Sequence, residues 1–118
     1  MDQRFLRTLE EIELADEPAL DGNGKVFDLF LRIGRMDEET VIAAYHTYRF
    51  FCQENRERFS RADIDRNGHI HGALIKRMLA LIAVAPKERQ RGLGLKFQAS
   101  AHSYTREIFD DFLKKVER

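Results

Sequence analysis

Apolar residues recur along most of this chain at spacings of three and four, which is the pattern of amphipathic helices. The pattern predicts five helical segments and no convincing β-sheet. Two of these segments, about residues 2–14 and about residues 101–116, carry one apolar stripe and an opposite polar face. We therefore expect an all-α protein in which both segments pack on a central core.

The second predicted helix, about residues 26–33, is apolar on nearly every side, which indicates that it is buried in the middle of the domain. Its apolar residues at alternate positions, from Phe27 to Ile33, also fit a β-strand. Gly34 directly after the segment is typical of a helix C-terminus and favours the helix.

The third predicted helix runs from about residue 37 to about residue 59 and has the clearest start signal in the chain. Asp37 can cap this helix, and Met36 can pack on Val41 as a hydrophobic staple. One sector of the helix is apolar and should face the core. Its members are Val41, Ala44, Tyr45, Tyr48, Phe51, Cys52 and Phe59.

Phe50 falls on the opposite side of the third helix, near Ala43 and His46. An aromatic residue away from the core face either meets a second layer of the same domain or marks a contact surface. Both interpretations agree with the sequence.

The fourth predicted helix, about residues 72–85, has a broad apolar arc and should form the centre of the core. Residues 86–98, between it and the last helix, contain several basic side chains, Pro86 and two glycines. Proline and glycine at such positions are typical of turns and connectors. We expect a flexible, basic loop there.

The composition indicates one ordered domain that spans residues 1–118. Of the 118 residues, 43% are apolar and only two are prolines, as in globular proteins. The longest apolar run, residues 78–85, is far shorter than the ~18 residues of a membrane span, and the start lacks the pattern of a secretory signal. A single cysteine excludes an internal disulfide, which favours a reducing, cytoplasmic location.

The stretch from Asp63 to Gly68 has the oxygen spacing of a calcium loop. Asp63, Asp65 and Asn67 take positions 1, 3 and 5 of such a loop, and Gly68 takes position 6, where a sharp turn is needed. The backbone carbonyl of His69 follows at position 7. These residues form the candidate metal site of the sequence.

Over about residues 59–79 this pattern resembles an EF-hand, and a fainter second copy lies near residues 19–33. Position 12, which is a glutamate in a calcium-binding hand, is Leu74 here, and leucine offers no oxygen. The resemblance is therefore to a degenerate EF-hand, which implies a helix–loop–helix whose metal is lost or held weakly. The Asp-Gly-Asn-Gly run of the second copy also fits a simple turn. The expected fold is a compact bundle of about five helices with one or two such units.

Enzyme signatures are missing from the sequence, which has no nucleophile elbow, phosphate-binding loop, paired cysteines or zinc-protease helix. Cys52 lies on a predicted core face, where a thiol is usually inert. On an extended segment His69 and His71 would point to one side and could chelate a metal, or they simply flank a buried Ile70. We expect no catalytic activity and no cofactor.

The sequence therefore predicts a small, non-enzymatic interaction or regulatory module that binds another protein. The binding surface would be an apolar groove or the face formed by Phe50, His46 and Ala43. A homodimer is one form that such a contact can take. No membrane partner is expected.

Two alternatives agree with parts of the sequence. The first is a weakly calcium-responsive protein that holds Ca²⁺ with Asp63, Asp65, Asn67 and His69. The second is an accessory protein that contacts nucleic acid through the basic segment, although the neutral total charge argues against it. The basic residues concerned are Arg61, Arg66, Lys87, Arg89, Arg91 and Lys96.

Overall fold

Six α-helices and one short 3-10 helix make up the described part of the chain, which contains no strand. The computed structural model describes residues 2–13, 22–58, 61–101 and 103–117, without the side chains at 13, 22–26, 58, 61–67, 103 and 104. The helices are α1 (Gln3–Glu13), α2 (Gly22–Ile33), α3 (Glu38–Glu54), η1 (Arg56–Arg58), α4 (Arg61–Val84), α5 (Lys87–Ser100) and α6 (Ser103–Val116). The all-α prediction is confirmed, with six α-helices in place of five.

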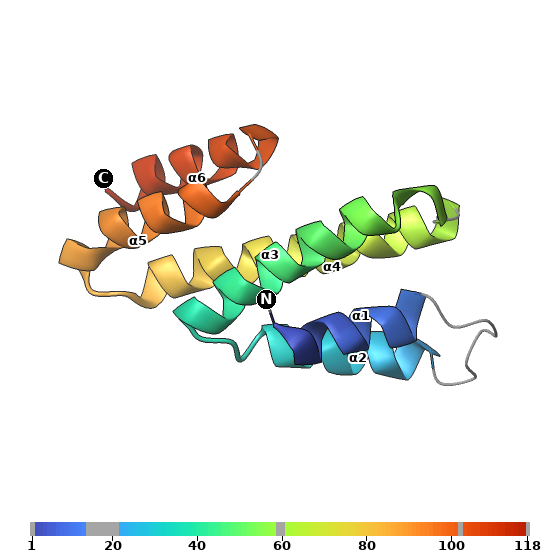
Figure 1. Cartoon of the computed structure of the whole chain (residues 1–118). Coiled ribbons are helices and arrows are strands. Elements are labelled where there is room, and N and C mark those ends of the chain that lie inside the picture. Colours follow the sequence, from blue (N-terminus) through green and yellow to red (C-terminus); the bar gives the residue numbers. More distant parts are fainter. Residues whose placement is uncertain (1, 14–21, 59–60, 102, 118) are drawn as a thin grey trace.

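The helices stack as three antiparallel pairs (Figure 1). α3 and α4 form the middle pair, with α1 and α2 on one side of it and α5 and α6 on the other. α4 contacts α2, α3, α5 and α6, so this helix links all three pairs. The chain measures 49 × 25 × 22 Å along its principal axes. Because only three pairs are stacked, each outer pair keeps a face that no described helix covers.

The core lies between the pairs and receives large apolar side chains from all six α-helices. The largest fully buried side chains are Tyr45, Phe5, Phe51, Phe97, Phe109, Leu9, Leu29, Ile33, Ile70, Leu74, Met78 and Ile82. Thr47 is a buried polar residue in this core. Its hydroxyl donates to the carbonyl of Ala43 and accepts from the backbone N–H of Asp2, each at 2.8 Å. Thr47 is therefore satisfied, and it fixes the start of α1 against α3.

The predicted start of α3 is confirmed. Asp37 has an extended backbone, and its carboxylate accepts a hydrogen bond from the backbone N–H of Thr40 at 2.8 Å. Met36 and Val41 are both buried, as the predicted hydrophobic staple requires. The pKa of Asp37 is lowered because Thr40, through its hydroxyl first and its backbone N–H second, stabilises the carboxylate.

Because of this cap, part of the free energy of unfolding should depend on pH. A group whose pKa is lower in the folded chain contributes stability above its unfolded pKa, and that contribution is lost as the pH falls below ~4. We expect Asp37→Ala to lower the melting temperature by a few degrees at neutral pH. Asp37→Ser, which keeps a capping oxygen, should melt close to the wild type at pH 7 and show a weaker loss of stability in acid. Thermal melts followed by circular dichroism between pH 3 and pH 7 test both variants.

α3 ends earlier than the predicted Phe59, which lies outside the described residues. The last helical residue is Glu54, and Asn55 follows it. The side-chain amide and the backbone N–H of Asn55 both donate to the carbonyl of Phe51, at 2.9 and 3.1 Å. This cap satisfies a carbonyl that the helix end would otherwise leave without a partner.

The loop predicted from Asp63 onward is wrong, because α4 is a continuous helix from Arg61 to Val84. No described glycine has a positive φ, so Gly68 does not make the sharp turn of a calcium loop. The physical reason is an apolar stripe at every fourth position from Ile70 to Ile82, all of it fully buried. Burying these side chains favours the helix by more than the ~1 kcal/mol that a glycine costs inside it.

The fainter second copy is also helical where the structure describes it. Residues 22–33 belong to α2, while residues 14–21 lie outside the described part. The choice of helix over strand for residues 26–33 is therefore confirmed.

The flexible loop predicted at residues 86–98 is wrong as well, because α5 spans Lys87–Ser100. Pro86 stands directly before the helix, where its fixed backbone fits the first turn. Leu93 and Phe97, one turn apart, are buried against the other helices. Tertiary contacts therefore stabilise as a helix a segment whose local composition favours a connector.

Gly94 allows α5 and α6 to approach closely. A Cβ atom built on Gly94 would lie 2.6, 2.8 and 2.9 Å from Cδ2, Cδ1 and Cγ of Leu113 on α6. A Cβ atom on Gly92, which is exposed on the same helix, would meet nothing within 4 Å. Of these two glycines, Gly94 is therefore the one that packing requires.

Candidate interaction surface

The outward face of α3 carries the predicted partner-binding residues. Phe50 is 42% exposed, His46 is exposed and Ala43 is half-buried. Their spacing of three and four residues places them on one side of the helix, away from the buried Tyr45 and Phe51. The structure therefore places the three predicted residues on one side of α3, where the described part of the chain leaves Phe50 partly exposed.

Exposed neighbours on α3 give this surface its chemistry. Glu54 lies one turn after Phe50, and Gln53 lies one turn after Arg49 on the adjoining edge. Arg49 itself is directed to α5, where its guanidinium donates to the carbonyl of Ser100 at 3.1 Å. The surface around Phe50 therefore combines an aromatic ring with a carboxylate and is suited to a partner that is partly apolar and partly basic.

A second exposed apolar surface lies on α2 and was missed by the sequence analysis. The prediction that residues 26–33 are buried on every side is wrong, because Phe27 is 61% exposed and Leu31 is 47% exposed. Leu29 and Ile33 supply the buried face. Among the described helices α2 packs chiefly on α1 and α4, and the side that carries Phe27 and Leu31 stays exposed. Periodicity could not reveal this, because both faces of the helix are apolar.

The candidate metal ligands do not sit in a loop. Asp63, Asp65 and Asn67 occupy helical positions of α4, and their side chains lie outside the description. His69 is exposed. Among the side chains that are described, no group of three His, Cys, Asp or Glu residues could hold a metal ion. Weak calcium binding at these residues stays a prediction from the sequence.

His71 is placed differently from His69. Its Nε2 atom lies 3.1 Å from the hydroxyl of the fully buried Tyr45, and the rings of Tyr45 and Tyr48 lie tilted against its imidazole. Because the backbone is helical and not extended, His69 and His71 do not share one side. Of the two interpretations open from the sequence, chelation by the pair is therefore excluded, and Ile70 between them is buried. The contacts of His71 join α3 to α4.

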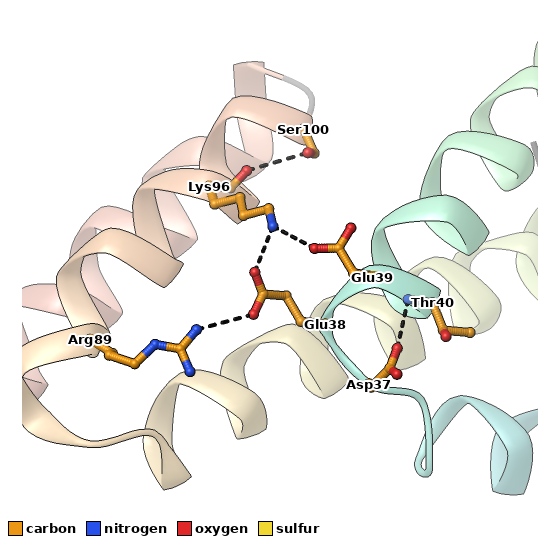
Figure 2. A network of polar contacts seen from close by, with 7 residues as sticks. All are labelled: Asp37, Glu38, Glu39, Thr40, Arg89, Lys96 and Ser100. Atoms are coloured by element: carbon orange, nitrogen blue, oxygen red, sulfur yellow. Dashed lines mark hydrogen bonds and ion pairs between the residues drawn. The ribbon is translucent and has the colours of Figure 1, made fainter.

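The basic residues of α5 lie close to carboxylates. Lys96 Nζ is 2.7 Å from an oxygen of Glu38 and 2.7 Å from an oxygen of Glu39, and Arg89 is 3.5 Å from Glu38 (Figure 2). Figure 2 shows this network joining α5 to the first turn of α3. The carboxylates of Glu38 first and Glu39 second raise the pKa of Lys96.

The nucleic-acid interpretation therefore loses part of its basis. Arg91 also has an acidic partner, Glu117 directly after α6, at 3.3 Å. Lys87 is exposed, and the side chains of Arg61 and Arg66 lie outside the description. A cation already paired with a carboxylate offers little net attraction to phosphate, since binding nucleic acid depends on uncompensated positive charge.

Comparison of the chain with protein-family models, with curated proteins and with solved structures finds no significant match. The resemblance to a degenerate EF-hand gains no support from these comparisons. Within the described part of the chain, none of the helices combines the length and the apolar character of a membrane-spanning segment. Cys52 is half-buried on α3.

Proposed function

We propose that this protein is a non-enzymatic interaction module that binds another protein through the outward face of α3. The observation that carries the proposal is the exposure of Phe50, 42%, on the side of α3 opposite its buried residues. Aromatic side chains are enriched where proteins bind one another, because one ring buries a large area with little loss of conformational entropy. His46, one turn before Phe50, and Ala43, two turns before it, extend the same surface along α3.

The partner segment should insert an apolar side chain beside Phe50 and place a basic side chain near Glu54. A helix laid across α3 or an extended peptide would both meet these requirements, and such recognition relies on a few apolar anchors. Replacing the exposed Phe50 by alanine should change the free energy of unfolding by no more than about 0.5 kcal/mol, so the variant should remain folded.

Site-specific photocrosslinking in the native cell tests this function. The chain is labelled with a photoreactive phenylalanine analogue at position 50 in one sample and at position 76, the exposed Lys76 of α4, in the other. We expect a discrete adduct of higher mass from position 50 only, weakened when Glu54→Lys reverses the charge one turn after the ring. No adduct, or the same adducts from both positions, would contradict the proposal.

A further inference from the structure

The open face of α2 has two different edges. Viewed along the helix at ~100° per residue, Leu31 lies in the middle of the exposed face. Phe27 lies about 40° to one side of Leu31, and Asp28 lies about 60° to the other side. Gly34 and Arg35 form the turn that closes α2, where their N–H groups donate to the carbonyls of Phe30 and Arg32. Because this turn continues the winding of the helix, Gly34 follows the edge of Phe27 and Arg35 follows the edge of Asp28. Leu31 and the four residues of these edges are exposed. One edge is therefore apolar and nearly flat, while the other carries one acid and one base.

The charged edge is uncompensated within the described chain. Asp28 and Arg35 form no ion pair or hydrogen bond there through their side chains, although the neighbouring Arg32 donates to the hydroxyl of Thr8 on α1 at 3.1 Å. Asp28 on α2 and Arg35 in the turn after it are seven residues apart, about two helical turns or roughly 10 Å, which is too far for them to pair with each other. Among the described residues, neither charge therefore has an opposite charge with which to form a salt bridge.

We propose that the face of α2 binds a second copy of this chain, with the two α2 helices antiparallel across a two-fold axis. Such an axis lies between the helices and perpendicular to them. The charged edge of one copy then lies beside the charged edge of the other, and the two chains run in opposite directions along it. Asp28 of each copy then lies beside Arg35 of the other. On the opposite edge Phe27 of each copy packs over Gly34 of the other, and the two Leu31 side chains meet in the centre.

The spacing of the residues supports this arrangement. The midpoint in the sequence between Asp28 and Arg35 lies within one residue of Leu31, and so does the midpoint between Phe27 and Gly34. A single two-fold axis therefore satisfies the ion pairs and the aromatic contacts together. A parallel two-fold pairing would set the charged edge against the apolar edge and would leave both charges without a partner. The surface is self-complementary only in the antiparallel arrangement.

The size of the contact sets its strength. α2 has 12 residues, about 18 Å of helix, so two such helices bury a small area compared with the ~1,600 Å² of a standard interface. We expect a reversible dimer that forms at micromolar or higher protein concentration. This inference goes beyond the proposed function, because it concerns another helix and does not require the Phe50 surface.

Sedimentation equilibrium of the full chain, from micromolar to millimolar concentration, tests the proposal. The wild type should dimerise, and Leu31→Asp, which places two carboxylates at the centre of the contact, should stay monomeric. The matched control is Ile108→Asp on α6, whose side chain is 43% exposed and which should dimerise like the wild type. Circular dichroism should show that both variants remain folded, since each substituted side chain is exposed.

A charge-reversal cycle then tests the orientation of the helices. Asp28→Arg and Arg35→Asp, each alone, create like-charged neighbours twice in every dimer and should weaken association about tenfold. The double variant restores opposite charges and should return the dissociation constant to within about threefold of the wild type. A wild type that stays monomeric, a dimer insensitive to Leu31→Asp, or a double variant no better than the single ones would overturn the proposal. None of these outcomes affects the crosslinking test at position 50.

Discussion

Replacing Leu74 with glutamate should lower the free energy of unfolding by about 3–5 kcal/mol, or prevent folding, because an ionised carboxylate would be buried without a partner. Leu74 is fully buried in the middle of α4. In a calcium loop the same substitution would supply the missing ligand at position 12 and create affinity for the ion. Urea unfolding with and without calcium therefore separates the continuous helix from the helix–loop–helix.

Two controls belong to this experiment. Leu74→Met keeps the volume and apolar character of the side chain and should cost less than about 1.5 kcal/mol. Ala80→Glu introduces the same charge at an exposed position of α4 and should change stability little. A folded Leu74→Glu variant that calcium stabilises would contradict the continuous α4 helix.

Gly68→Ala should raise the free energy of unfolding, whereas Leu74→Glu should lower it. Gly68 is an exposed position of α4, and a Cβ atom there would meet nothing within 4 Å. Alanine in a helix interior is favoured over glycine by about 1 kcal/mol, so we expect the variant to be more stable by roughly that amount. In a calcium loop, where this glycine makes the sharp turn, alanine would destabilise the chain. Urea unfolding of the wild type and of Gly68→Ala shows whether the substitution raises or lowers the free energy of unfolding.

Gly94→Ala is the second substitution with a large expected effect. The new methyl group would overlap the buried side chain of Leu113 and push α5 away from α6, at a cost of about 1–3 kcal/mol. The same substitution at Gly92 meets open space and should stabilise the chain by up to about 1 kcal/mol. Chemical denaturation of the two variants compares a packed glycine with an unpacked one on a single helix.

A double-mutant cycle identifies the contact responsible. Leu113→Ala alone should cost about 2–5 kcal/mol, because it leaves a cavity between α5 and α6. Gly94→Ala added to Leu113→Ala should cost nothing further, since the atoms that the methyl group would overlap are gone. If the losses of unfolding free energy in the two single variants simply add in the double variant, the close approach of Gly94 to Leu113 does not cause the destabilisation by Gly94→Ala.

Local sequence signals were enough for the elements whose apolar residues form a single stripe. α1 and α6 lie close to their predicted bounds, because each has one apolar face and one polar face. The start of α3 was predictable from Asp37, whose side chain satisfies the first turn wherever the helix lies in the fold. The separation of Phe50 from the core face of α3 follows from the same periodicity.

The predictions of loops in α4 and α5 were wrong because the local preference of these segments disagrees with their tertiary packing. Gly68 and Gly94 favour turns in an isolated chain, yet both lie inside helices. In α4 the buried stripe from Ile70 to Ile82 outweighs the cost of the glycine. In α5 the glycine is what lets the helix approach Leu113. A single sequence does not show which glycine has a neighbour that needs its missing side chain.

The sequence by itself determined that this chain is helical, where α1 and α6 lie, where α3 begins, and which side of α3 carries Phe50. These properties depend on residues close together in the chain. Only the tertiary structure decided that α4 is unbroken, that α5 is a helix, and that Phe27 and Leu31 stay exposed. The reason is that burial depends on how many neighbours surround a helix. α2 has α1 and α4 on one side only, and its composition does not reveal which apolar face they leave open.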